Sequence, residues 1–236
     1  MKKRRWTSLA LAMLMTMSLA ACGGGEDSEE ASSGSENDGT VFKVGSTSPL
    51  TGSAAIYGNA VKNGAQIAVD EINAEGGPIQ FEFRCEDDVA DPEKAVNAYN
   101  KLKDWGMQLS LGSTTSKCCE AVAAEVFADR IFALTPSASS TATTSGKDNM
   151  FQLCYMDPNL GAASAQYIAN KNLATKVAVI WKNDDVYCKG VRDAFMAKAE
   201  ELRLDVVSEM TFADGNDTDF SVQLTDENKV LRVSSN

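Results

Sequence analysis

Hydrophobic and polar positions alternate along the chain in two different periods from Val41 onward. Short runs rich in β-branched and aromatic residues predict strands, and longer runs with apolar residues three to four positions apart predict helices. The predicted strands are residues 41–48, 79–85, 107–112, 131–136, 150–155, 176–181 and 205–212. The predicted helices are residues 61–76, 91–106, 118–129, 159–171 and 187–202.

The order of these elements predicts the fold class. Strands that alternate with single helices pair in parallel through right-handed crossovers, so the chain is expected to form a doubly wound α/β fold. Local signals support one helix in particular, because Asp91 stands at the capping position, Pro92 at the first helical position and Gly106 after the last turn. A Ser/Thr-rich stretch, residues 135–149, interrupts the alternation and is either a disordered linker or a functional loop.

The N-terminus indicates export. A basic segment, "MKKRRW", precedes an apolar run that is too short to span a bilayer comfortably. The sequence Leu19-Ala20-Ala21-Cys22 resembles the lipobox of bacterial lipoproteins, which implies that residues 1–21 are a signal peptide and that Cys22 carries the lipid. The alternative is an ordinary signal peptide with an incidental cysteine. The acidic residues 22–40 then form a flexible tether, because they contain too few apolar side chains to build a core.

Composition excludes several kinds of function. The chain contains no histidine, so it has no Ser-His or Cys-His pair and no imidazole to bind zinc. Its net charge is −11, and without Lys2, Lys3, Arg4 and Arg5 the remaining 18 basic residues face 33 acidic ones. Such a chain repels phosphate backbones, so we expect no nucleic-acid partner.

Three polar loops follow predicted strands of the first half, at residues 47–59, 112–117 and 135–140. Ligands of open parallel sheets bind beyond the carboxyl ends of the strands, so these loops are expected to share one rim. Hydroxyls and amides at a helix N-terminus favour a small anion such as a carboxylate. The plain alternative is that these serines and threonines only cap helices.

The stretch "GSTTSKCCEA" has three chemical alternatives. Ser116 with Lys117 as its base would make a Ser-Lys hydrolase, but no further motif supports it. Cys118 and Cys119 lack the spacing of a metal site, and the stretch lacks the pattern of a phosphate-binding loop. We therefore expect no catalytic residue, no metal and no cofactor.

Several motifs occur in an order that resembles a known family: "KVGSTSPLTGSAAIYGNAVKNGAQIAVDEINAEGG", "DPEKAVNAYNKL", "GSTTS", "LTPSASS", "ASAQYIA" and "DDVYCKGVRDAF". They are similar to type I periplasmic binding proteins, in particular the branched-chain amino-acid-binding (leucine/isoleucine/valine-type) lipoproteins that serve ABC transporters. The resemblance covers residues 41–225. It implies two α/β lobes that close on a ligand, with residues 41–155 as the first lobe and 156–236 as part of the second.

The resemblance also implies site residues. Ser116 matches the serine that holds the amino-acid carboxylate, Ser137 a position that binds through its backbone carbonyl, and Ser139 a hydroxyl that contacts the ligand. Tyr57 stands where an aromatic residue covers the ligand, and Tyr187 matches the second-lobe tyrosine that meets it on closure. Taken alone, Tyr187 would be interpreted as a packing residue and Tyr57 as an exposed loop aromatic.

The chain departs from the family pattern in two places. Lys117 and two thiols stand where the family usually has small residues. Family members also continue well beyond "DFSVQLT", so the second lobe is expected to be incomplete, and the acidic residue for the ligand ammonium lies in the part that has no counterpart here.

The cysteines suit an exported protein, but five remain besides Cys22 and they cannot all pair internally. Cys85 ends the second predicted strand, and Cys118 and Cys119 follow the third, so a disulfide between Cys85 and either of them is expected if these strands are neighbours. Cys154 is an alternative partner.

The expected function is that of an extracytoplasmic, lipid-anchored solute-binding protein. It would capture a small amino acid of the branched-chain type, or a related carboxylate, and deliver it to ABC permease subunits. The alternatives are a sensory ligand-binding module of the same fold and the Ser-Lys hydrolase. A truncated chain would bind its ligand feebly.

Overall fold

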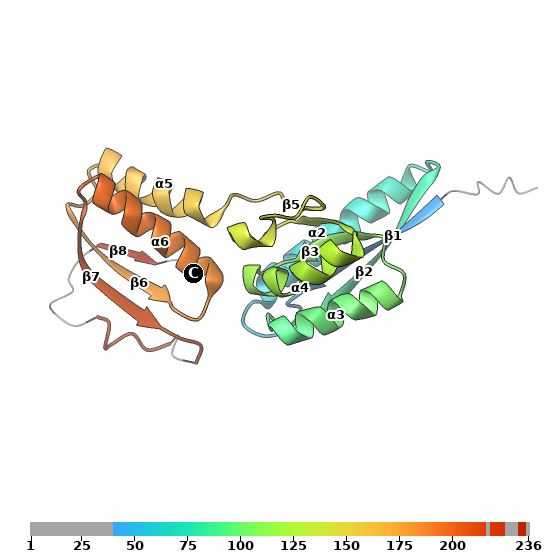
Figure 1. Cartoon of the computed structure of the whole chain (residues 1–236), viewed down its shortest axis with the longest axis horizontal. Coiled ribbons are helices and arrows are strands. Elements are labelled where there is room, and N and C mark those ends of the chain that lie inside the picture. Colours follow the sequence, from blue (N-terminus) through green and yellow to red (C-terminus); the bar gives the residue numbers. More distant parts are fainter. Residues whose placement is uncertain (1–39, 216–217, 225–230, 235–236) are drawn as a thin grey trace, which may run out of the picture. The chain divides into compact units, whose positions relative to one another are not determined.

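The computed structural model describes residues 40–215, 218–224 and 231–234, which form two parallel sheets flanked by helices (Figure 1). The predicted signal peptide, Cys22 and the acidic tether up to residue 39 lie outside the described residues. The strands of the first sheet are β1 (Thr40–Ser48), β2 (Ile79–Asp87), β3 (Leu109–Ser113), β4 (Phe132–Thr135) and β5 (Met150–Gln152). Those of the second are β6 (Lys176–Lys182), β7 (Asp205–Phe212) and β8 (Leu231–Ser234).

As the sequence pattern predicted, α-helices connect β1 to β2, β2 to β3, β3 to β4, β5 to β6 and β6 to β7. They are α2 (Ala55–Ala74), α3 (Pro92–Asp104), α4 (Ser116–Asp129), α5 (Asp157–Asn170) and α6 (Val186–Glu201), with a short 3-10 helix η1 (Thr141–Thr143) before β5. We call β1–β5 with α2–α4 the first sheet region, and β6–β8 with α5 and α6 the second sheet region. Figure 1 shows α3 beside α4 in the first sheet region and α5 beside α6 in the second, and these pairs pack against each other.

All strand pairs are parallel, in the order β2-β1-β3-β4-β5 and β7-β6-β8. The doubly wound α/β fold is therefore confirmed. This arrangement follows from the connections, because a parallel strand needs a crossover long enough to hold a helix. It places the carboxyl ends of β1, β3 and β4 at one edge of the first sheet, and the polar segments that follow them meet there.

Each sheet region has its own apolar core. In the first, Tyr99 and Leu102 of α3 pack with Cys118, Val122 and Val126 of α4. In the second, α5, α6 and β6 contribute a cluster that contains Ala165, Ile168, Val177, Phe195 and Ala199. The two thiols of the opening turn of α4 therefore take the positions of core side chains, facing away from solvent.

The observed helix boundaries show where local sequence signals were sufficient to predict the start of a helix. Asp91 caps α3 by accepting a hydrogen bond from Lys94 N at 2.9 Å, with Pro92 in the first turn. By contrast, α2 begins at Ala55, six residues before its predicted start, so Tyr57 lies in a helix and not in a loop. The segment 135–149 is ordered and contains η1. The sequence did not indicate β8, which pairs with β6.

The predicted disulfide is wrong for this structure, since Cys85, Cys118, Cys119 and Cys154 carry free thiols. The reasoning assumed that the second and third strands are neighbours, but β1 lies between β2 and β3. Adjacent strands are about 4.8 Å apart, so the ends of β2 and β3 are separated by about twice that distance. Cys118 and Cys119 are also turned into the core of α3 and α4.

Candidate functional site

Hydroxyl side chains tie the carboxyl ends of three strands together. Thr47 Oγ1 and Ser113 Oγ are 2.6 Å apart, and Ser48 Oγ and Thr114 Oγ1 are 2.8 Å apart, which joins β1 to the end of β3. Thr135 Oγ1 donates to Ser113 O at 3.0 Å and joins β4 to the same point. All five side chains are buried. This hydroxyl network fixes the backbone from which the polar loops start, because buried polar groups that satisfy one another are costly to disrupt.

A cavity of about 410 Å³ opens beyond these strand ends. Its volume falls in the range of small-molecule sites. All five predicted ligand-binding residues line it: Tyr57, Ser116, Ser137, Ser139 and Tyr187. The structure thus brings together residues that are up to 130 positions apart in the chain.

Ser116 is the first residue of α4 and is buried. Its Oγ accepts hydrogen bonds from the backbone N–H groups of Ser139 and Ser140, at 3.0 and 3.2 Å. A serine hydroxyl has two acceptor lone pairs and one proton, so the group that remains is the O–H donor. At a helix N-terminus, whose partial charge is positive, such a donor suits an anion.

The loop after β4 is held by the side chains around it. Ser140 Oγ donates to Glu120 Oε1 of α4, and Ser139 O accepts from Asp157 N at 3.0 Å. Ser139 is buried, whereas Ser137 is exposed. The loop therefore presents one buried and one exposed serine to the cavity, and both are anchored through their neighbours.

The aromatic residues differ in their settings. Tyr57 is 55% exposed at the start of α2. Burial raises the pKa of Tyr187 to about 12, and the neighbouring Tyr155 raises it as well, so the Tyr187 hydroxyl stays neutral and can donate a hydrogen bond.

Five further polar residues line the cavity: Thr114, Thr115, Tyr155, Lys182 and Asp185. The two threonines belong to the predicted polar loop 112–117, whereas sequence reasoning did not single out the other three. Asp185 caps α6, accepting from Cys188 N at 3.0 Å. Lys182 pairs with Asp214 and lies 4.0 Å from Asp184. The acidic pair in "DDVYCKG" was a signal for the cap, but nothing in the sequence placed Lys182 in a cavity.

The structure describes the surroundings of Ser116 and of the two thiols in "SKCCEA". Burial raises the pKa of Cys118 to about 12 and that of Cys119 to about 11, so neither thiol ionises near neutral pH. The Ser116 oxygen accepts from loop amides, and no hydrogen bond joins it to Lys117 in the part of the chain that the structure describes. In that same part, no three acidic or cysteine side chains are grouped to hold a metal ion.

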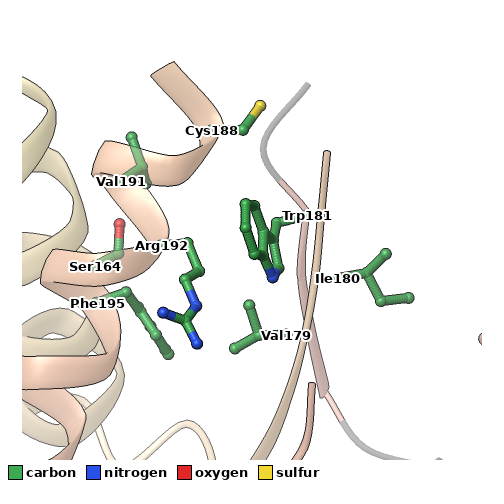
Figure 2. A pocket seen from close by; sticks show the side chains of 8 residues that line it. All are labelled: Ser164, Val179, Ile180, Trp181, Cys188, Val191, Arg192 and Phe195. Carbon is green, nitrogen blue, oxygen red and sulfur yellow. The ribbon is translucent and has the colours of Figure 1, made fainter. Parts of the chain in front are cut away.

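A second, much smaller cavity lies in the second sheet region (Figure 2). Its volume is about 30 Å³, and Figure 2 shows Arg192 and Phe195 of α6 beside Trp181 and Val179 of β6. Arg192 lies over the Trp181 ring, with its guanidinium carbon 5.4 Å from the ring centroid. This space is comparable to the volume of a single water molecule and cannot hold an amino acid.

Residues 41–226 match the periplasmic binding protein family, and the chain belongs to that family. It is 34% identical over 185 residues to the Leu/Ile/Val-binding protein BraC3 of Rhizobium johnstonii, covering 77% of this chain and 50% of that protein. The chain therefore spans about half the length of the curated relatives that it matches.

Solved structures agree with this assignment. The branched-chain amino acid transporter substrate binding protein LivJ from Streptococcus pneumoniae, in complex with isoleucine, superposes with a TM-score of 0.73 at 32% identity, covering 79% of this chain and 53% of that one. The leucine binding protein LivK from Thermotoga maritima gives a TM-score of 0.71 at 26% identity, covering 77% and 51%. Both are similar to this chain over its two sheet regions.

No helix within residues 40–215, 218–224 and 231–234 combines the length and the apolar content needed to cross a membrane.

Proposed function

We propose that this chain is an extracytoplasmic solute-binding protein of an ABC transporter that captures a small amino acid, of the branched-chain type or a related carboxylate, without catalysing a reaction. The observation that carries the proposal is the Ser116 hydroxyl, whose oxygen is occupied by two loop amides and whose proton is left to donate beside the N-terminus of α4. The names of the relatives, which bind leucine, isoleucine or valine, support the ligand class.

The two sheet regions would act as lobes, with residues 41–155 forming the first and residues from 156 onward belonging to the second. The first would hold the ligand through Ser116, Ser137 and Ser139, and the second would close over it with Tyr187. Hinge closure of this kind is a common way for two α/β lobes to enclose a ligand.

The first test is titration calorimetry of the chain with L-leucine, L-isoleucine and L-valine, in its unaltered form and as Ser116→Ala. Losing a hydrogen bond to a charged group costs about 1.5–3 kcal/mol, so Ser116→Ala should weaken binding roughly ten- to a hundred-fold. Cys119→Ser, three residues further along the same helix and buried in the core, serves as the control and should change affinity much less. Equal affinities of the unaltered chain and Ser116→Ala would contradict the assignment of the carboxylate site.

The second test concerns attachment to the membrane. We propose that the signal peptide, residues 1–21, is removed and that the lipid on Cys22 anchors the mature chain, which then delivers its ligand to permease subunits. Because the diacylated cysteine would be the anchor, Cys22→Ser should release the protein or leave its precursor uncleaved. Fractionation of expressing cells and mass measurement of the N-terminal peptide check this. A cleaved Cys22→Ser product that remains in the membrane fraction would count against lipidation.

A further inference from the structure

Asp87 is the last residue of β2, and its side chain binds the loop that follows the neighbouring strand β1. Asp87 Oδ1 accepts a hydrogen bond from Leu50 N at 2.8 Å, and Asp87 Oδ2 accepts one from Thr51 Oγ1 at 2.6 Å. Hydrogen bonds to an ionised carboxylate are stronger than those between neutral groups. One carboxylate thus holds two successive residues of loop 49–54, which leads from β1 into α2.

The turn that follows Asp87 has an unusual backbone. Val89 and Ala90 have positive φ angles of 53° and 55°, although neither is glycine. Such a conformation is rare for a β-branched residue and persists only where the surroundings stabilise it. Asp87 Oδ1 accepts from Val89 N at 2.9 Å, and Asp88 Oδ1 accepts from Ala90 N at 2.9 Å. The Asp87 carboxylate is therefore fixed against its own turn as well as against loop 49–54.

Loop 49–54 in turn holds the first two turns of α2. Asn59 Nδ2 donates to Leu50 O at 3.1 Å and to Ala55 O at 2.8 Å, which joins the loop to the helix. Gly58 lies against the loop backbone, since a Cβ built on it would be 2.0 Å from Pro49 O. Gly58 is also the buried residue of α2, and no side chain caps this helix. The start of α2 therefore depends on the loop for its position.

This start of α2 forms part of the cavity wall. Ala54 and Tyr57 line the cavity, whereas Asp87 does not. Because Tyr57 is 55% exposed, packing around its ring constrains it little, and its place at the cavity follows from the backbone of α2. Hydrogen bonds and backbone contacts thus connect Asp87 with Tyr57 through loop 49–54.

We propose that Asp87 is a positioning residue for Tyr57. Its carboxylate binds loop 49–54 to the end of β2 and so sets where the start of α2, with Tyr57, stands at the cavity. The effect on affinity rests on the proposed function, since it requires an amino acid in this cavity. Part of the recognition then depends on a carboxylate that does not touch the ligand.

The placement is tested without a ligand, by hydrogen exchange of the full chain. Asp87→Ala should speed exchange over residues 49–59 about ten-fold, because the loop and the start of α2 lose their attachment. Asp87→Asn keeps an acceptor for Leu50 N and should recover part of the protection.

Asp91→Ala is the matched control for this exchange experiment. It removes another carboxylate that follows β2, one that caps α3 by accepting from Lys94 N, so it should leave exchange over residues 49–59 unchanged. Unchanged exchange over residues 49–59 in Asp87→Ala, or an equal increase in Asp91→Ala, overturns the proposal.

The consequence for recognition is measured by calorimetry with L-leucine, at a temperature at which every variant is folded. Asp87→Ala should weaken binding about ten-fold, because the ordering of the loop and of Tyr57 then has to be offset on binding. Asp91→Ala should bind L-leucine with unchanged affinity, although it loses a helix cap and with it some stability. Equal affinities of the unaltered chain and Asp87→Ala would contradict the proposal.

A double variant decides whether Asp87 acts through Tyr57. Tyr57→Ala with Asp87→Ala should bind L-leucine no more weakly than Tyr57→Ala alone, since residues in one network are not additive. Additive losses would show that Asp87 acts by another route and overturn the proposal. If the unaltered chain does not bind L-leucine, the proposed function fails for this ligand, and the hydrogen exchange still decides whether Asp87 positions the start of α2.

Discussion

On the side of the cavity contributed by the first sheet region, the polar groups are hydroxyls, whereas the second sheet region contributes Lys182, Asp185 and Tyr187. The hydroxyls belong to a buried network that spans β1, β3 and β4. The charged groups of the second sheet region form ion pairs close to solvent, such as Lys182 with Asp214 and Arg192 with Glu209. One side is thus fixed by neutral contacts in the interior, and the other by charges that salt can screen.

The largest expected loss of stability comes from a substitution in the second sheet region, at the contact between α5 and α6. A Cβ built on Gly161 would lie 2.1 Å from Val191 O, which is backbone and cannot move aside easily. Gly161→Ala should therefore cost about 3 kcal/mol by overpacking, and it should loosen the second sheet region while the first stays folded. Hydrogen exchange measured on both sheet regions checks this.

Gly64→Ala is the control for that variant, because nothing lies within 4 Å of a Cβ at Gly64 in α2. It should stabilise the protein by about 0.5–1 kcal/mol, since alanine is the better helix former. Equal protection of both sheet regions in Gly161→Ala would mean that they unfold as one unit.

In the first sheet region, the buried carboxylate of Asp88 should make the stability of the protein depend on pH. Burial raises the pKa of Asp88 to about 6, with one oxygen unpaired in the described structure and Asp87 and Asp91 adding repulsion. A folded pKa above the unfolded value near 4 means that Asp88 contributes stability below about pH 4, which is lost as the pH rises through 6. Asp88→Asn should therefore be more stable than the unaltered chain by about 1–2 kcal/mol at pH 8, and nearly equal to it at pH 4.

The neighbouring Asp87 supplies a control of opposite sign. Its slight burial raises the pKa, but hydrogen bonds from Thr51, Leu50 N and Val89 N outweigh this and lower it. Asp87→Asn should thus lose stability at neutral pH and lose little in acid, because a depressed pKa stabilises the fold above the unfolded value. Urea unfolding of Asp88→Asn at pH 4 and pH 8, and of Asp87→Asn at about pH 2 and pH 8, gives the two slopes, and slopes of the same sign would refute the interpretation of Asp88.

The smallest expected effect is a difference in salt dependence between a charged contact of the second sheet region and a neutral contact of the first. Glu209 accepts from Arg192 Nε and Nη2 at 2.7 Å and from Trp181 Nε1 at 2.8 Å, close to solvent. Glu209→Gln should cost about 0.5–1 kcal/mol at low salt and less in 1 M NaCl, where screening weakens the pair. Thr47→Val removes one buried hydroxyl pair instead and should show a cost that salt does not change. A salt-independent cost for Glu209→Gln would show that its contact to Trp181 dominates.

Local signals were enough for most of the fold. The strand 205–212 was predicted with its observed ends, and α3 with its cap at Asp91, because both depend on residues close in sequence. The start of α2 was placed too late, since Gly58 and the residues around it indicate a loop when considered alone. Gly58 fits there because its Cα lies against the backbone of Pro49, and that contact is tertiary.

The sequence predicted the serines that line the cavity but not all of its other polar residues. The serines were found because hydroxyls after parallel strands gather at one edge, and the resemblance selected Ser116, Ser137 and Ser139 among them. The order of strands was not predictable from periodicity, which is why the expected disulfide at Cys85 failed: the position of β1 between β2 and β3 depends on the whole sheet. Lys182 was missed for the same reason, as its place in the cavity depends on contacts made across the fold.

Under the proposed function, the two amide hydrogen bonds to Ser116 Oγ would affect the rate at which a ligand is captured. A serine hydroxyl without hydrogen bonds samples several rotamers. Binding that requires one of these rotamers is slowed until the side chain adopts it, and the binding free energy must also offset the side-chain entropy that is lost. At Ser116 the rotamer is already selected by the loop backbone, so that part of the ordering cost is met during folding. The limiting step for ligand entry would then be diffusion into the open cavity followed by lobe motion, and local rearrangement of the carboxylate contact would add no delay.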